Sequence, residues 1–382
     1  MLKRVGILTL YAGSCNYGGV LQAYGLCALV AQEGGTPRQI LYRKTKTPGS
    51  RLRALCKKNL KRILLRAGQQ VQTKVCDRLY HVERDMANRR GAFDAFKKAY
   101  IPDSGRVYHP DTIPEAVPEY DLFICGSDQV WNPNVVDDAY FLRFVPEGKG
   151  KIAYAVSIAA PIPEAMKNRY AEAMAHLDGV SVREERAVSQ LADLSPVPAR
   201  WVLDPVLMLS REDWEAVAAP KETREKYLLC YFLGHDRAYR RLAERYAREK
   251  GLKIVSLPYV SKVHPLSDQR FGDERLFDVG PDRFLGLLRD AECVMTDSFH
   301  ASALCHIYEK PFWALRRTTQ HADEGRVEGL LRATGLEDRF LRNCGSGTAE
   351  KIAAEKAPDF SQTRKFLEEM REISLDYLRK YL

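Results

Sequence analysis

The stretch "VMTDSFHASALCHIYEKPF", residues 294–312, begins as an apolar strand and continues as a helix. Its polar residues Asp297, Ser298 and His300 fall where the strand ends and the helix starts. In α/β proteins, ligands gather at the carboxyl ends of the strands of a parallel sheet. This stretch therefore predicts an α/β fold with a ligand site at the junction.

The rest of the chain repeats the same alternation. Strands are expected at 4–10, 38–43, 120–128, 151–158, 179–184 and 199–205, and then at 227–234, 253–258, 293–298 and 312–316. Helices are expected at 17–35, 236–251 and 281–291. Strands that read as continuous apolar runs between helices predict parallel sheets covered on both faces.

A chain of 382 residues is long for one hydrophobic core, so two domains are expected. We assign 1–210 to an N-terminal Rossmann-like domain with a basic helical insertion near 44–100, and 211–360 to a C-terminal Rossmann-like domain. The two parallel sheets would face each other across a cleft. The polar stretch 209–225 reads as the connection between the domains, and the amphipathic helix 361–382 could cross back to the N-terminal domain.

Composition narrows the class of protein. The chain has no apolar run of 18 residues and no cleavage site after its first apolar stretch, so a cytoplasmic protein is expected. Nine irregularly spaced cysteines without a CxxC or HExxH pattern predict reduced core thiols, such as Cys125, Cys230 and Cys293, and no metal site.

The net charge of +9 belongs to one segment. Twelve lysines and arginines and no acidic residue lie between Gly34 and Cys76, so the remainder of the chain is slightly acidic. This uneven distribution argues against a nucleic-acid partner. Within residues 51–67, apolar residues form one helical stripe and the cations lie elsewhere. That pattern fits peripheral contact with an anionic membrane, and it fits equally well a surface helix packed on its own domain.

Two strand ends in the N-terminal half carry residues suited to a sugar. Asn16 and Gly18 stand at a helix start, where backbone amides are free, although glycine there is also common in tight turns. Ser127, Asp128, Gln129 and Trp131 follow the strand 120–128. Carboxylate and amide groups suit hydroxyls and an indole suits a ring face, while the alternative is a turn with a core tryptophan.

Two further residues suit an anion and a proton. Arg183 directly follows the strand 179–184 and could hold a carboxylate or phosphate, or else form a surface ion pair with Glu184 or Glu185. His300 near a helix start could move a proton near neutral pH, or could be a structural histidine.

Taken together, these segments resemble the polysaccharide pyruvyl transferase family. The resemblance is carried, in the family's order, by "NYGGVLQAY", "GSDQVWNP", "YAVSIA", "SVRE", "LDPVLML", "TDSFHASALCHIYEKPF" and "EGRVEGLLRATGLEDR". It implies a two-lobed fold like that of the GT-B glycosyltransferases, and transfer of pyruvate from phosphoenolpyruvate to a glycan as a ketal. Phosphoenolpyruvate would be a co-substrate, with no other cofactor.

The resemblance also implies roles for individual residues. The catalytic residues would be His300, which moves protons, and Asp128, which orients or deprotonates an acceptor hydroxyl. The C-terminal domain would be the donor side and the N-terminal domain the acceptor side. Donor-binding residues would be Arg183, Ser298, Phe299 and Arg326, and acceptor-binding residues would be Asn16, Tyr17, Gly18, Ser127, Gln129 and Trp131.

The leading hypothesis is thus a pyruvyltransferase for a cell-surface polysaccharide, such as a capsule or exopolysaccharide, or for its lipid-linked precursor. Residues 51–67 would hold it at the inner face of the membrane. One alternative is a GT-B-type glycosyltransferase that uses a nucleotide sugar in the same cleft. Another is a non-catalytic, membrane-associated scaffold.

Overall fold

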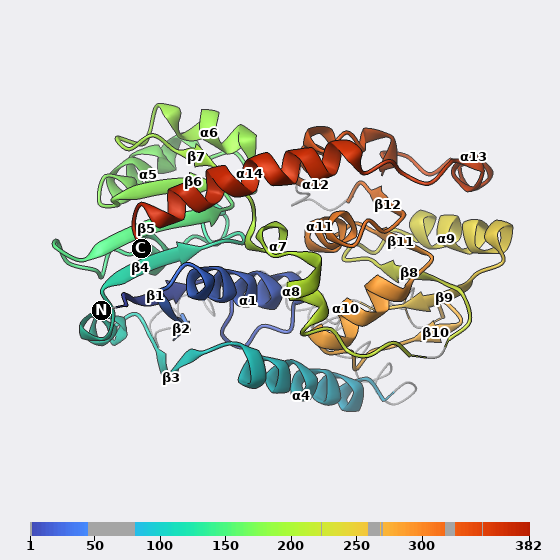
Figure 1. The fold of residues 1–382 in the computed structure, drawn as a ribbon, viewed down its shortest axis with the longest axis horizontal. Helices are drawn as coiled ribbons and strands as arrows, with labels where there is room; N and C mark the ends of the chain where they lie inside the picture. Colours follow the sequence, from blue (N-terminus) through green and yellow to red (C-terminus); the bar gives the residue numbers. More distant parts are fainter. Residues whose placement is uncertain are drawn as a thin grey trace, which may run out of the picture.

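A computed structural model describes residues 2–44, 81–222, 224–258, 268, 270–317, 325–345 and 347–382. Two parallel sheets, each with helices around it, lie side by side along the long axis of the molecule (Figure 1). The predicted architecture of two parallel α/β domains is confirmed. The segment 51–67, on which the membrane hypothesis rests, lies outside the described residues.

The N-terminal sheet has seven parallel strands in the order β3-β2-β1-β4-β5-β6-β7. They are β1 (Arg4–Leu8), β2 (Thr36–Tyr42), β3 (Asp103–Tyr108), β4 (Leu122–Gly126), β5 (Gly150–Val156), β6 (Gly179–Val182) and β7 (Arg200–Trp201). The chain reverses its direction of winding between β1 and β4. The loops after these two strands therefore open a crevice at the carboxyl edge of the sheet.

The C-terminal sheet has six parallel strands in the order β10-β9-β8-β11-β12-β13. They are β8 (Tyr227–Tyr231), β9 (Lys253–Ser256), β10 (Glu274–Arg275), β11 (Cys293–Thr296), β12 (Phe312–Leu315) and β13 (Phe340–Leu341). Here the reversal lies between β8 and β11. The junction that ends β11 is thus the second place where a ligand crevice is expected.

The described helices cover these sheets (Figure 1). The α-helices are α1 (Tyr17–Gln32), α4 (Val82–Tyr100), α5 (Lys167–Met174), α6 (Glu185–Ala192), α7 (Pro205–Met208), α8 (Arg211–Glu215), α9 (Arg237–Lys250), α10 (Pro281–Asp290), α11 (Phe299–Ile307), α12 (Arg326–Ala333), α13 (Thr348–Ala354) and α14 (Ser361–Arg379). Short 3-10 helices occupy Ile113–Glu119, Asp138–Phe141, Glu164–Met166 and Glu337–Arg339.

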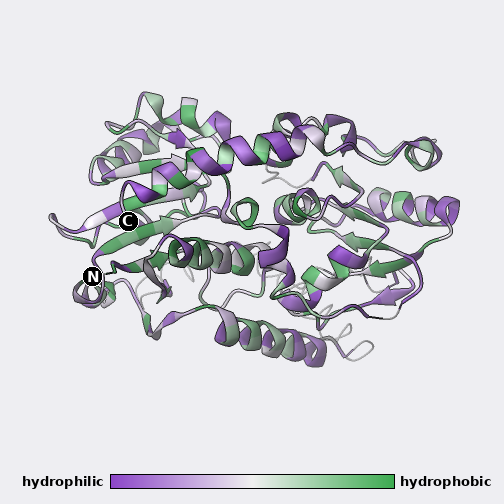
Figure 2. Cartoon of the chain, viewed as in Figure 1, coloured by the Kyte–Doolittle hydropathy of each residue, from purple (hydrophilic) through white to green (hydrophobic). Residues whose placement is uncertain are grey.

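One hydrophobic core runs through both domains. The strands are apolar, whereas the exposed sides of helices such as α14 are polar (Figure 2). Tyr17 at the start of α1 stacks on Phe284 of α10 with ring centroids 4.1 Å apart, and its hydroxyl donates to the carbonyl of Val279 at 2.9 Å. Because α1 lies in the N-terminal domain and α10 in the C-terminal domain, these contacts fix the position of one crevice relative to the other.

The helix α14 runs along both domains (Figure 1). Its Ser374 hydroxyl accepts from the backbone of Leu203 at 2.9 Å, and its Tyr377 hydroxyl donates to the carbonyl of Ala153 at 2.8 Å. Both partners belong to the N-terminal domain. The end of the chain therefore fastens the C-terminal domain onto the N-terminal one.

Three strands and one helix differ from the sequence expectations. The edge strand β3 reads "DSGRVY" and is largely exposed, and β10 and β13 have two residues each, so none of them carries an apolar run. The stretch 209–225, expected to be a polar connection, contains α8 with a fully buried Trp214. Its indole donates to the carbonyl of Val206, which anchors the connection in the core.

Candidate functional site

The crevices of the two sheets meet at one point, where α1 and α11 begin. A Cβ atom added to Gly18 would lie 2.0 Å from Nδ1 of His300, far inside ordinary contact. Only glycine allows this approach, because any side chain would displace the imidazole. Asn16 caps α1 by accepting from the amide of Gly18 at 2.9 Å, which fixes the glycine against the ring. The sequence-predicted residues Gly18 and His300 are thus brought together.

His300 is buried beside an arginine and an aspartate. Its Nε2 lies 3.3 Å from Nη1 of Arg183 and 3.8 Å from Oδ2 of Asp204. Because a guanidinium can only donate, Nε2 accepts in this contact and the ring is neutral. Burial lowers the pKa of His300 to about 4, and Asp204 offsets this only in part. The imidazole is therefore a neutral base at pH 7, whereas the sequence led us to expect titration near neutrality.

Arg183 is surrounded by three carboxylates. Its side chain is 0% exposed, and it donates to Asp204 at 2.7 Å and to Glu184 at 3.4 Å. Nη2 lies 3.7 Å from Oδ1 of Asp128, and within the described chain this nitrogen has no hydrogen-bond partner. Burial acts to lower the pKa of Arg183, but the carboxylates, Asp204 above all, raise it overall. Arg183 is thus a fixed cation whose Nη2 can still donate to a ligand.

Asp204 and Glu184 are the site residues that sequence reasoning missed. Asp204 Oδ2 accepts from the Ser127 hydroxyl and from Arg183, both at 2.7 Å, and the carboxylate is fully buried. Glu184 accepts from the Ser157 hydroxyl as well as from Arg183. The available signal was an aspartate directly before a proline at a helix start, as in "LDP", which is too common to single out.

Asp128 follows β4 in a strained conformation. Its φ is +58°, a left-handed value that non-glycine residues adopt only at a cost. Such strain is concentrated at functional sites. The side chain of Asp128 is 16% exposed, whereas that of Asp204 is fully buried. Of these two carboxylates, Asp128 is therefore the one that a ligand can reach.

The predicted donor-side residues surround the start of α12. Arg326, the first residue of α12, is 6% exposed, and the amide oxygen of Gln129 accepts from its Nη2 at 2.8 Å in the amide orientation that satisfies both groups. Burial, with a smaller effect from neighbouring Arg183, lowers the pKa of Arg326 to about 9, and Glu184 and Asp128 offset part of this shift.

Ser298 and Phe299 take different places at the start of α11. The Ser298 hydroxyl accepts from the amide of Ala301 at 3.4 Å and so caps the helix. The Phe299 ring lies under Arg183, with the guanidinium carbon 4.7 Å from the ring centroid. Such a stacked cation is held in one plane.

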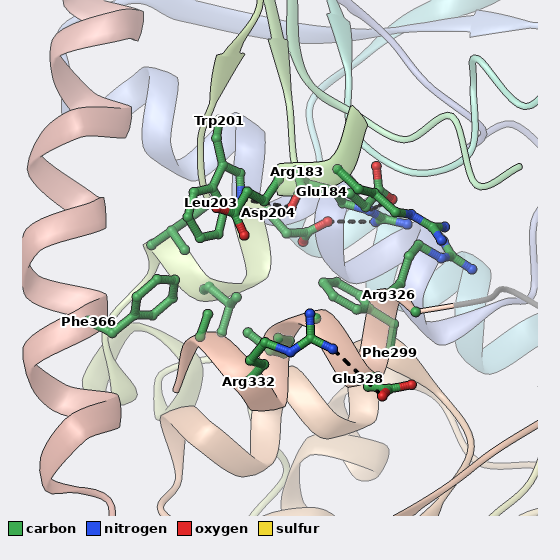
Figure 3. Close-up of a pocket in the computed structure, with 17 residues that line it drawn as sticks. Arg183, Glu184, Trp201, Leu203, Asp204, Phe299, Arg326, Glu328, Arg332 and Phe366 are labelled. Atoms are coloured by element: carbon green, nitrogen blue, oxygen red, sulfur yellow. Dashed lines mark hydrogen bonds and ion pairs between the residues drawn. The ribbon is translucent and has the colours of Figure 1, made fainter. Parts of the chain in front are cut away.

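A cavity of about 220 Å³ opens beside this cluster, between the two domains. Figure 3 shows Arg183, Glu184 and Asp204 pointing toward one another at one side, with Phe299 and Arg326 beside them. The other side is apolar and is lined by Trp201, by Leu203 and, from α14, by Phe366. A small ligand with anionic groups at one end fits this division.

None of the six predicted acceptor residues lines this cavity, nor do the predicted residues His300, Asp128 and Ser298, and two of the six are buried elsewhere. Trp131 is 0% exposed, and its indole donates to the carbonyl of Tyr140 at 3.0 Å. The prediction that Trp131 stacks on a sugar ring is therefore not supported. Tyr17 is likewise buried, in the contact between the domains described above. Within the described residues, no group of three or more histidine, cysteine, aspartate or glutamate side chains is arranged to hold a metal ion.

Comparisons with known proteins agree with this architecture. The model of the polysaccharide pyruvyl transferase family matches residues 16–318. No curated protein sequence matches the chain.

Solved structures resemble the chain over nearly its full length. A protein described as a UDP-N-acetylglucosamine 2-epimerase from Listeria monocytogenes is 11% identical over 96% of this chain and 95% of its own, with a TM-score of 0.51. MnaA from S. aureus, solved with UDP, is 11% identical over 97% and 91%, with a TM-score of 0.50. The E. coli ADP-heptose LPS heptosyltransferase II is 9% identical over 96% and 99%, with a TM-score of 0.40. At these identities the first two likenesses show the fold alone.

Proposed function

The chain belongs to the polysaccharide pyruvyl transferase family, and on this basis we propose that it transfers pyruvate from phosphoenolpyruvate to two hydroxyls of a saccharide, as a ketal. The observation that carries the proposal is the contact between His300 and Arg183 beside a cavity that Arg326 also lines. Two cations that line one small cavity, with a neutral base in contact with one of them, suit an anionic enol ester and its proton transfers.

The donor is proposed to lie against Arg326. Its guanidinium lines the cavity, and burial lowers its pKa. A bound anionic ligand would favour the charged form of this arginine. The remaining N–H of Arg183 would hold a second oxygen of the same ligand. Arg183 then both contacts the donor and orients His300.

The reaction needs two additions at C2 of the donor. In the first, one acceptor hydroxyl attacks C2, loses its proton to a base, and a proton is added to C3, so the C=C bond becomes a CH₃–C unit. In the second, the C2–phosphate bond breaks and the other hydroxyl bonds to C2, its proton leaving with the phosphate. Neutral His300 can accept the first proton at Nε2 once its contact with Arg183 opens, and Asp204 at 3.8 Å would stabilise the imidazolium that forms.

The acceptor is proposed to lie on the side of Asp128. This carboxylate is partly exposed and lies nearest Nη2 of Arg183, whereas the buried Asp204 lies nearest Nη1. It can accept a hydrogen bond from a sugar hydroxyl and orient it toward C2 of the donor. The loop of Asn16 and Gly18 borders the same space through its contact with His300.

We propose further that the acceptor belongs to a cell-surface polysaccharide or its lipid-linked precursor, at the inner face of the membrane. The basic segment 51–67 supports peripheral attachment through its sequence. Among the helices that the structure describes, none is long and apolar enough to cross a bilayer.

The competing functions give different results in one experiment. A glycosyltransferase would be stabilised against heat by UDP- or GDP-sugars and not by phosphoenolpyruvate, and a scaffold by neither. The proposal predicts stabilisation by phosphoenolpyruvate, loss of that effect in Arg326→Ala, and its retention in Arg332→Ala. Arg332 is a matched control because it lines the same cavity with a side chain that is 70% exposed. Stabilisation of Arg326→Ala equal to that of the wild type would overturn the donor placement.

A further inference from the structure

A second, larger cavity lies on the N-terminal domain, at the carboxyl ends of β1 and β2 and along α4. It is a groove of about 920 Å³. Its lining includes four cations, Arg43, Arg90, Lys97 and Lys98, and two acids, Asp94 and Asp103. None of these residues was among the candidates from the sequence, and the groove is separate from the cavity beside Arg183.

The two acids of the groove are already engaged. Asp94 lies 3.4 Å from the ammonium of Lys97, which also donates to the carbonyl of Ser14 at 2.6 Å. Asp103 accepts from the backbone amide of Gly105 at 2.7 Å. Asp94 is thus paired with Lys97, whereas Asp103 keeps its negative charge, and the four cations outnumber the two acids of the lining.

Three cations of the groove have no such partner. The side chains of Arg43, Arg90 and Lys98 form no ion pair or hydrogen bond with any residue in the described ranges. Arg43 lies over the loop after β1, since a Cβ on Gly13 would be 3.1 Å from its Nη2. Like charges that gather in one concave surface repel each other and attract an anion there. Arginine and lysine together are the usual donors to phosphate oxygens.

The groove adjoins the proposed acceptor side. The loop after β1 forms its wall through Tyr11 and Cys15. Gly18, which contacts His300, follows Cys15 by three residues, a span of at most about 11 Å. The Ser14 hydroxyl of this loop and Oδ2 of Asp128, which follows β4, lie 3.4 and 3.7 Å from the position of a Cβ on Gly19 in α1. A ligand in the groove can thus extend toward Asp128 within the length of a sugar or two.

We propose that this groove binds the phosphate or diphosphate group through which the saccharide acceptor is joined to its carrier. The inference rests on the proposed function for the identity of the saccharide, but the anion site stands on its own contacts. The carrier could be a lipid or a nucleoside, which share this chemistry.

The test is binding of inorganic pyrophosphate, farnesyl diphosphate and UDP, each measured by calorimetry with phosphoenolpyruvate present in excess to occupy its own site. The triple variant Arg43→Ala, Arg90→Ala, Lys98→Ala is compared with a triple control on α9, Arg241→Ala, Arg245→Ala, Arg248→Ala. The control removes three exposed cations from a distant helix. Melting temperatures establish that both variants fold.

The groove variant is expected to bind pyrophosphate at least about tenfold more weakly, the effect of losing one charge-assisted hydrogen bond, while the control matches the wild type. Farnesyl diphosphate binding more tightly than UDP assigns the carrier to a lipid, and the reverse assigns it to a nucleoside. Equal pyrophosphate affinity in wild type and groove variant overturns the proposal. If pyrophosphate binds the wild type more tightly than the groove variant but phosphoenolpyruvate does not bind at all, the proposed function is contradicted and the anion site in the groove is still supported.

Discussion

Replacing Gly18 by alanine places one methyl group against the imidazole of His300. The new Cβ would lie 2.0 Å from Nδ1 and 2.6 Å from Cγ and Cε1, whereas ordinary contact begins at 3.4 Å. The ring would have to retreat by more than ~1 Å, and a displacement of that size at reacting groups lowers the rate by about a hundredfold. We therefore expect kcat for phosphate release from phosphoenolpyruvate, with a saccharide acceptor present, to fall by about this factor.

Stability should change little in the same variant. Alanine is favoured over glycine in a helix by up to about 1 kcal/mol, which offsets part of the strain from moving the ring. Gly91→Ala in α4 is the control, because a Cβ there meets no atom within 4 Å. A double-mutant cycle isolates the cause: in a His300→Ala background, Gly18→Ala should have no further effect on kcat. Full activity of Gly18→Ala, or two effects that simply multiply, would refute the assigned contact.

Three further predictions concern buried groups. Replacing His306 by glutamine breaks the contact of its ring with the Thr334 hydroxyl at 2.9 Å. The free energy of unfolding in urea should fall by about 1–3 kcal/mol, and kcat should not change. Lost activity in a stable variant would contradict a structural role for His306. Trp131→Phe removes the hydrogen bond to the carbonyl of Tyr140 and should likewise lower the free energy of unfolding by about 1–3 kcal/mol, without raising KM for the acceptor. A raised KM would indicate that Trp131 contacts the acceptor. The pKa values of His300 and His306 are both lowered from 6.5 to about 4, so as the pH falls protons bind the unfolded chain before the folded one. The free energy of unfolding should therefore decline from about pH 6.5 downward, and it should decline less steeply in His306→Gln. Identical slopes in the two proteins would contradict the burial of His306.

The sequence was informative about the fold wherever a buried strand reads as an apolar run. Residues 293–296 and 122–126 are of this kind, and polar residues follow both strands. The exposed strand β3 and the two-residue strand β13 escaped prediction because sheet-edge pairing, not an apolar run, makes them strands. Trp214 also could not be placed from local sequence. Its hydrogen-bond partner Val206 is near in sequence, but its burial depends on tertiary packing that the local pattern does not reveal.

The site was predictable in outline because strand ends can be read from the sequence. Arg183 and His300 are separated by 117 residues, and the structure places them 3.3 Å apart. What the sequence could not supply was the charge balance around them. Asp204 is recognisable only once its 2.7 Å contact with Arg183 is known, and the lowered pKa of His300 follows from burial between two domains. Trp131 illustrates the converse, since a sugar-binding composition occurred at a position that the fold buries.

Pyruvyl transfer itself is measured most directly by mass spectrometry of a saccharide acceptor incubated with the protein and phosphoenolpyruvate. We predict that the acceptor gains the mass of one pyruvate less one water, with one phosphate released for each ketal formed. The gain should disappear in His300→Ala and persist in His306→Gln, a buried histidine on the same helix. An unchanged gain in His300→Ala, or a product that carries a new sugar in place of pyruvate, would contradict the proposed reaction.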